Sequence, residues 1–402
     1  MATRTEPERS ALPERRPELD AIRMLVVIGL VFFHSALVFA ADDDFYVKNA
    51  QTTEAVLITA GFGVVWAMPL LFLISGLGAW HSLHRRGAGG FAKERLLRLG
   101  VPLVFATLVL NPLPQWLRAR SADATYHESY LGFLPRFYDV RLAPAEFPFL
   151  VQGEHFETGH LWFVVLLLAF SLMLAPLFRW LPREHVRHTC DRLAHTVLRR
   201  RGTVLLPALA FAAICAFARM EEDFAGWHRW SYLLFFIAGF TLAADDRFRA
   251  VMRRDAGLAA WLGVLLFAAC GPGFALADKP FTEATVLATA SRALFGAAGW
   301  CLVVAIPGLL DRRRLRHPPA APNPDPTTRR RLHGYLAAAV LPLYVLHQPI
   351  VVAVAYFVVG WPAPIPVKYT VLVTIALALT LAMYELLIRR TRATRFLFGM
   401  RP

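Results

Sequence analysis

Long apolar runs recur along the 402-residue chain and limit what it can fold into. An α-helix rises about 1.5 Å per residue, so about 20 apolar residues cross the roughly 30 Å hydrocarbon layer of a membrane. Only 18% of the residues are charged, whereas soluble domains have about 25%. The sequence therefore predicts an all-α polytopic membrane protein with about ten transmembrane helices. The predicted runs are 21–41, 56–80, 96–117, 160–181, 203–219, 227–244, 256–277, 285–310, 332–359 and 367–388.

Basic residues are unevenly divided between the connections of these runs. If the N-terminus is cytoplasmic, the cytoplasmic connections hold Lys and Arg in a ratio of roughly three to one over the opposite side, as the positive-inside rule requires. This bias predicts a multi-pass membrane protein with cytoplasmic tails at 1–20 and 389–402 and a membrane domain at 21–388. The formal net charge of +14 then reflects topology and attraction to anionic lipids, so no nucleic-acid partner is predicted.

The first run carries polar residues that are costly in hydrocarbon. Arg23 lies near its start and His34 lies further along, and an ionisable residue at such depth costs about 2.5–3.5 kcal/mol or more. At about 100° per residue, the two side chains lie within about 20° of each other around a helix. Asp20 precedes Arg23 by one turn. We predict that this stripe lines a reaction site. The run is longer than the apolar part of a cleaved signal peptide, the alternative interpretation.

A second candidate site follows the second run. Arg95 and Arg98 are one helical turn apart, and we expect both guanidinium groups to reach the same point. Guanidinium groups match phosphate oxygens in geometry and stay charged. The alternative is an ordinary positively charged flank of a transmembrane helix.

Further candidate residues stand at the ends or inside other runs. Ser75 lies six residues after a proline and directly before a glycine. This pattern is typical either of close helix packing or of a substrate passage. His160 and Trp162 open the fourth run, where a solvated histidine and an interfacial tryptophan are the simpler interpretation. Tyr344 and His347 lie within the ninth run, where polar groups should face the bundle interior.

The remaining features concern connections and cysteines. We expect 118–159 to form a partly ordered cap and the proline-rich segment 317–326 to be an extended linker. Glu385 is expected to pair with Arg389 and Arg390. The four cysteines have no metal-binding or disulfide spacing, so the sequence predicts no metal site. Ligation of iron or copper by intramembrane histidines would need further histidines at suitable spacing.

Taken in order, these motifs resemble the acyltransferase-3 family of integral membrane acyltransferases. Their details are most similar to the branch that contains a glucan-succinylating membrane protein. One departure is Ala21, where many members have glycine. The matching stretches are Glu18-Leu-Asp20-Ala-Ile-Arg23 with His34, Phe-Leu-Ile-Ser75-Gly76, Arg95-Leu-Leu-Arg98 with Pro102, His160-Leu-Trp162-Phe163 and Tyr344-Val-Leu-His347-Gln-Pro349.

The resemblance implies transfer of an acyl group from cytoplasmic acyl-CoA to a hydroxyl of an extracytoplasmic carbohydrate or glycolipid. Acyl-CoA is then a donor substrate, and no permanently bound cofactor is expected. By the resemblance, His34 is the catalytic base and Arg23 its essential neighbour. Arg95 and Arg98 contact the phosphates of coenzyme A.

Physical chemistry agrees with this division of roles. A sugar hydroxyl is a poor nucleophile, and a histidine is a natural general base, worth roughly 10²–10⁴-fold in rate. Eleven residues of straight helix separate Arg23 from His34 by about 16 Å, which excludes direct contact. We therefore expect Asp20 and Arg23 at the cytoplasmic entrance and His34 nearer the outer side.

Three alternatives to general-base catalysis remain open. His34 could carry the acyl group itself in a two-step relay. The protein could be a transporter of a lipid-linked sugar or small acid with His34 as a proton relay. It could also be a scaffold in which the polar residues only join helices.

Overall fold

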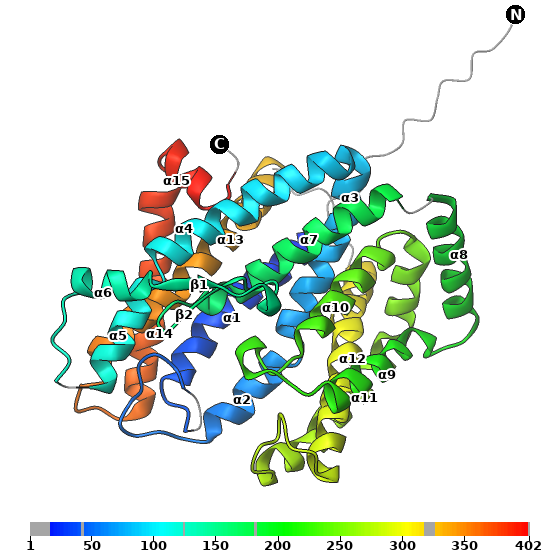
Figure 1. Cartoon of the computed structure of the whole chain (residues 1–402). Helices are drawn as coiled ribbons and strands as arrows, with labels where there is room; N and C mark the ends of the chain where they lie inside the picture. Colours follow the sequence, from blue (N-terminus) through cyan, green and yellow to red (C-terminus); the bar gives the residue numbers. More distant parts are fainter. Residues whose placement is uncertain (1–16, 42–43, 124, 181–182, 317–325, 401–402) are drawn as a thin grey trace, which may run out of the picture.

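The computed structural model describes residues 17–41, 44–123, 125–180, 183–316 and 326–400, and these are helical almost throughout (Figure 1). Leu96–Gly100 and Tyr384–Ile388 are π-helical turns that continue α3 and α14. Strands β1 (Val140–Leu142) and β2 (Val151–Gly153) form a small antiparallel sheet. The helices are α1 (Pro17–Leu37), α2 (Ala55–Val64), α3 (Ala67–Arg95), α4 (Val101–Val109), α5 (Pro112–Ala122), α6 (Tyr130–Phe137), α7 (Trp162–Trp180), α8 (Arg183–Arg199), α9 (Pro207–Phe217), α10 (Arg229–Leu242), α11 (Asp246–Leu276), α12 (Val286–Arg316), α13 (Pro326–Val358), α14 (Ile365–Met383) and α15 (Arg392–Leu397).

Seven helical segments among the described residues are long and apolar enough to cross a membrane. Together with the near absence of strands in this part of the chain, they confirm an all-α polytopic membrane protein. The segments are Glu18–Leu37, Gly61–Ala122, Gly159–Trp180, Asp246–Leu276, Val286–Arg316, Gly334–Val358 and Ile365–Ile388.

The segments differ from the ten predicted runs in two ways. Gly61–Ala122 covers most of the run 56–80 and all of 96–117, because helical structure also occupies the connection between them. That helical structure is kinked at Gly87, whose φ of 69° and ψ of 174° are not helical. The runs 203–219 and 227–244 instead contain α9 with 11 residues and α10 with 14 residues. Both helices are shorter than the about 20 residues that a straight crossing needs. The number of crossings and the side of each terminus remain predictions.

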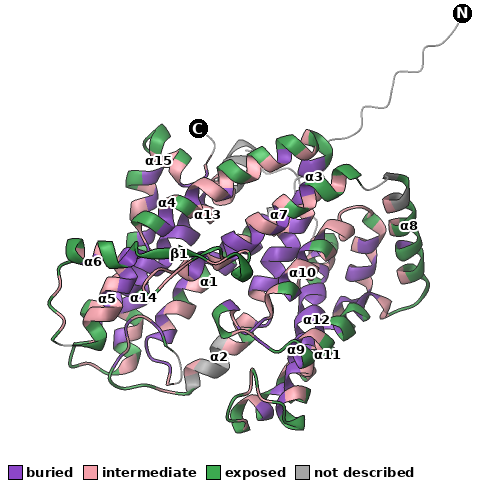
Figure 2. Cartoon of the chain, in the orientation of Figure 1, coloured by how far each residue is buried: buried purple, intermediate pink, exposed green. Residues whose placement is uncertain are grey.

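Apolar side chains occur both inside the bundle and on its surface. Figure 2 shows buried residues concentrated along the central helices, whereas α8 is largely exposed. Large apolar side chains are also exposed on the long helices, among them Leu25 at 63%, Trp261 at 71% and Leu265 at 58%. An exposed apolar surface on this scale is expected where lipid, rather than water, surrounds the helices.

Glycines set the distance between α3 and α10, which pack against each other. A Cβ atom on Gly76 would lie 2.0 Å from the carbonyl oxygen of Phe236, and one on Gly239 would lie 1.9 Å from that of Leu73. Small residues of this kind let helix backbones approach closely in a membrane. The glycine after Ser75 therefore has the packing role that its sequence pattern indicated.

The connections also match their predictions where they are described. The segment 118–159 contains α6 and the two-stranded sheet, so the expected cap is partly ordered. Glu385 forms an ion pair with Arg389 at 2.6 Å, and Arg390 donates to the backbone carbonyl of Glu385. The proline-rich linker lies outside the described residues, apart from its last residue, which begins α13.

Replacing Gly239 with alanine should destabilise the fold. The added methyl group overlaps the Leu73 carbonyl, and overpacking of this kind costs about 1–3 kcal/mol. The measurement is the apparent melting temperature of purified protein in detergent. Gly29→Ala in α1 is the matched control, because its Cβ meets nothing within 4 Å and alanine favours helix by about 1 kcal/mol. Equal melting temperatures for the two variants would contradict the close approach of α3 and α10.

Candidate active site

Three histidines from distant parts of the sequence meet at one end of α1. The ring centroids of His34 and His347 are 5.1 Å apart, and those of His160 and His347 are 5.0 Å apart. His34 lies on α1 and His347 on α13, two helices that pack together, while His160 lies just before α7. His160 is buried, so the interpretation of a solvated boundary residue is wrong.

A proline explains why His160 is held in this position. Pro349 has no N–H group, so the carbonyl of Val345 four residues earlier lacks its helical donor. Nε2 of His160 lies 3.1 Å from that carbonyl oxygen and donates to it. The hydroxyl of Tyr344 in turn donates to the backbone carbonyl of His160. The two bonds fasten the start of α7 to α13.

The hydrogen bonds leave two imidazole nitrogens available for chemistry. Nδ1 of His347 bonds to the backbone carbonyl of Tyr344. A carbonyl only accepts, so this nitrogen carries the proton and Nε2 of His347 is an acceptor. Nε2 of His347 and Nδ1 of His34 are both buried without a hydrogen-bond partner among the described residues. Buried nitrogens of this kind call for an explanation, and binding of a hydroxyl group is one.

The end of α1 sets the depth of His34. The helix ends at Leu37, four residues before the end of the predicted run 21–41. His34 therefore belongs to the last turn of α1. The ammonium group of Lys48 donates to the carbonyls of Leu37 and Ala40, and a cation there stabilises the helix C-terminus. His34 is half-buried and stacks on Phe45 with ring centroids 5.8 Å apart. The returning loop thus forms one wall of the histidine site.

Trp162 lies beside this site within a cluster of aromatic rings. Its ring centroid is 5.2 Å from that of Tyr232 on α10 and 5.6 Å from that of Phe224. The sequence suggested an interfacial tryptophan, whereas this ring faces neighbouring helices.

A partly buried polar network lies next to the histidines and was missed by the sequence reasoning. The hydroxyl of Tyr46 donates to the carboxylate of Glu157, and the side chain of Gln348 lies near Tyr46. Burial raises the pKa of the Glu157 carboxyl, and it raises the pKa of Tyr46 well above its usual value. Gln348 follows His347 directly, and Glu157 precedes His160 by three residues. That proximity in sequence was the only available signal.

Charged residues gather at the opposite end of α1. Arg23 donates to Asp20 at 3.0 Å and to the backbone carbonyl of Ile74 on α3 at 3.2 Å. The pairing of Asp20 with Arg23 follows from their spacing and was predicted. Ser75, next to Ile74, is half-buried. Glu18 reaches Arg314 of α12 at 3.4 Å, so ion pairs fix this end of α1 on both sides.

Arg95, the last residue of α3, and Arg98, in the π-helical turn that follows it, join this charged cluster. The guanidinium of Arg95 lies over the Phe91 ring at 4.9 Å, and its Nε atom is buried without a partner among the described residues. Nε of Arg98 donates to the carbonyl of Gly399 at 3.4 Å. The two groups have different neighbours, and the charges of Arg98, Arg23 and Arg86 all act on Arg95. Single π-helical turns often occur at functional sites.

The two clusters lie at opposite ends of one uninterrupted helix. Eleven residues of α1 separate Arg23 from His34, which corresponds to about 16 Å along the helix axis. One end presents guanidinium groups, and the other presents imidazole nitrogens beside a polar loop. Such an arrangement can bind an anionic group at one end and activate a hydroxyl at the other.

Comparison with models of protein families matches residues 16–385 to an acyltransferase domain, the acyltransferase 3 model. The match covers most of the chain and includes both clusters. No curated protein and no solved structure matched the chain.

A double-mutant cycle should detect the bond between His160 and Val345. His160→Ala removes the donor to a buried carbonyl and should cost about 1–3 kcal/mol of unfolding free energy. In a Pro349→Ala background the new N–H group can donate to Val345, so the same histidine change should cost less. We expect a coupling of about 0.5–3 kcal/mol from unfolding of the four proteins in mixed micelles. Additive effects would mean that the proline and the histidine do not share this carbonyl.

Proposed function

This chain belongs to the acyltransferase 3 family of integral membrane acyltransferases, and we propose that it moves an acyl group from cytoplasmic acyl-CoA to a hydroxyl of an extracytoplasmic carbohydrate or glycolipid. The observation that carries the proposal is the pair of opposed clusters on α1. The basic cluster suits the donor, and the histidine cluster suits the acceptor.

The donor end is supported by an excess of positive charge. The charges of Arg23, Arg86 and Arg98 act on Arg95 there. Arg23 pairs with Asp20, and Arg86 and Arg98 both pair with Glu94. Coenzyme A carries phosphate groups, and arginine binds phosphate through charge-assisted hydrogen bonds. In this proposal the phosphates rest at Arg95 and Arg98, and Arg23 with Asp20 stands at the entrance for the acyl-bearing arm.

The acceptor end supports general-base catalysis by His34. His34 removes the proton of the acceptor hydroxyl while the oxygen attacks the thioester carbonyl. The new ester bond forms, the carbon–sulfur bond breaks, and the thiolate of coenzyme A leaves and takes up a proton. Nε2 of His347 is an acceptor beside His34 and suits a positioning role, because it can receive a hydrogen bond from the protonated base. Proton transfer of this kind contributes about 10²–10⁴-fold.

The orientation follows from the same arrangement. The basic cluster belongs on the cytoplasmic side, where acyl-CoA is made available, and this agrees with the positive-inside bias of the sequence. The histidine cluster, the loop with Tyr46 and the network around Glu157 then face the extracytoplasmic side of the inner membrane. Polar loop residues at that face suit an acceptor rich in hydroxyl groups.

Replacing His34 with alanine should abolish acyl transfer, with a loss of about 10²–10⁴-fold in kcat. The measurement is transfer from radiolabelled acyl-CoA to membrane glycans in vesicles. His81→Ala, an exposed histidine on α3, is the matched control and should keep full activity. Full transfer by a folded His34→Ala protein would refute the base, whereas acyl label retained on wild-type His34 would favour a two-step relay.

Replacing both Arg95 and Arg98 with alanine should weaken acyl-CoA binding. A charge-assisted hydrogen bond is worth about 1.5–3 kcal/mol, so each lost contact should raise Kd by about tenfold or more. Isothermal titration with a non-hydrolysable acyl-CoA analogue measures the change. Arg85→Ala, an exposed arginine on the same helix, should leave Kd unaltered. If the double variant binds as tightly as the Arg85 control, the pair is only a positively charged flank.

A further inference from the structure

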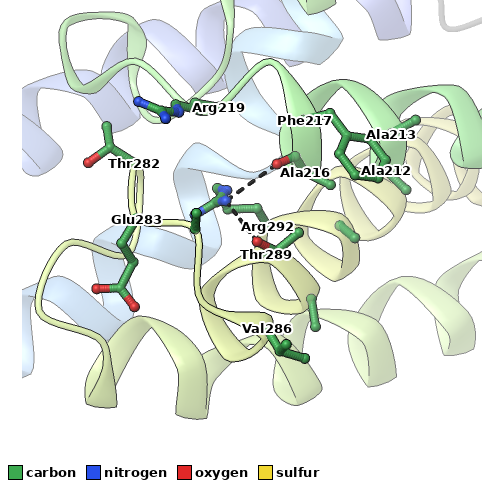
Figure 3. A pocket seen from close by; sticks show the side chains of 13 residues that line it. Ala212, Ala213, Ala216, Phe217, Arg219, Thr282, Glu283, Val286, Thr289 and Arg292 are labelled. Carbon is green, nitrogen blue, oxygen red and sulfur yellow. Dashed lines mark hydrogen bonds between the residues drawn. The ribbon is translucent and has the colours of Figure 1, made fainter.

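A groove lies on the bundle away from α1 and α13, where the end of α9 meets the start of α12 (Figures 1 and 3). Its volume is about 790 Å³, within the range of about 300–1,000 Å³ that ligand sites usually have. The groove is lined by α9, by the loop after it, and by the segment from Thr282 to Ala293. Neither cluster of the candidate active site contributes to it.

The groove divides into an apolar wall and a polar mouth. Alanines of α9 and α12 form most of the wall, together with Phe217 and Val286, which are 82% and 87% exposed. Arg219, Thr282 and Glu283 stand at the mouth (Figure 3). Val286 is the first residue of a candidate membrane span, so the polar mouth lies at one end of that span. This division matches an amphiphile with a polar head and an apolar chain.

Arg292 supplies a buried positive charge to the groove. Its side chain is only 2% exposed and donates to the carbonyls of Cys215, Ala216 and Pro280 and to the hydroxyl of Thr289. All four acceptors are neutral, and no carboxylate forms an ion pair with Arg292 within the described part of the chain. Buried charges are normally paired, so a negative group in the groove would supply the missing counter-ion.

The net charge of the groove, with Glu283 and Arg219 included, also favours a negatively charged ligand. Glu283 is the acidic residue of the groove, and its carboxylate is already bonded to the hydroxyl of Thr285 and the backbone N–H of Lys279. Arg219 is exposed at the mouth and makes no hydrogen bond or ion pair with described residues. The groove thus has two guanidinium groups and one carboxylate, with a net positive charge at its polar end.

We propose that this groove binds an anionic glycerophospholipid of the surrounding membrane. The phosphate lies between Arg219 and Arg292, and one acyl chain follows the alanine wall. A bilayer lipid satisfies both halves of the site, because it brings the phosphate to the depth of Arg219 and the chain to the depth of Val286. The proposal does not depend on which acyl group or acceptor the enzyme uses.

The test measures binding of dioleoylphosphatidylglycerol to the full-length protein in detergent by native mass spectrometry. Dioleoylglycerol, with the same chains and no phosphate, and glycerol 1-phosphate, with the headgroup alone, are the comparison probes. We expect phosphatidylglycerol to bind at least about tenfold more tightly than either, since a charge-assisted phosphate contact and the chain contacts act together.

Two variants with matched controls localise the binding. Arg219→Ala should weaken phosphatidylglycerol binding by about tenfold, whereas Arg141→Ala, an exposed arginine on β1, should not alter it. Ala290→Trp fills the groove and should abolish binding, whereas Leu276→Trp, at a 75% exposed position outside the groove, should not. The proposal would be overturned if dioleoylglycerol or glycerol 1-phosphate bound as tightly as phosphatidylglycerol. It would also be overturned if either variant bound phosphatidylglycerol as its control does.

Discussion

The cost of placing polar groups in hydrocarbon governs the whole arrangement around α1. A bilayer offers no water to satisfy such groups, so each must find a partner on another helix or line a passage. Arg23 is matched by Asp20 and by a carbonyl of α3, whereas His34 contacts the rings of His347 and Phe45 and leaves its buried Nδ1 for the site. At the same end of α1, Lys48 donates to the carbonyl of Leu37. The first helix is therefore held at both ends by polar contacts, and its neighbours α3 and α13 are fixed by the same requirement.

Interruptions of regular helix structure lie at both ends of this arrangement. Pro349 frees a carbonyl that captures His160, and the π-helical turn that begins at Leu96 presents Arg98 toward the C-terminal segment. In a membrane a freed backbone group must be satisfied again, so an interruption recruits a polar side chain from a distant part of the sequence. The interruptions thus bring together residues that a regular helix would keep apart.

The sequence predicted contacts that depend on short spacing and missed those that depend on folding. Asp20 with Arg23 and Glu385 with Arg389 follow from helical geometry alone, and both pairs are present. The contact between His160 and Val345 joins residues 185 apart in the chain. No sequence periodicity could reveal this contact. The sequence did indicate that the carbonyl of Val345 needs another donor, because Pro349 has no N–H group. The π-helical turn also explains why the spacing of Arg95 and Arg98 did not predict their separate partners.

The distance between the two clusters limits how an acyltransferase of this design can work. In the proposed mechanism, a thioester that stayed beside the phosphates could not reach His34, because Arg23 and His34 are about 16 Å apart along α1. The donor must therefore be long enough for its reactive end to reach His34 while its charged end remains at Arg95 and Arg98. Acyl-CoA has this division into a charged head and a long neutral arm, whereas a small acyl phosphate does not. The separation of charge and base along α1 thus selects for an extended donor, and it keeps the anionic part of that donor out of the hydrocarbon layer.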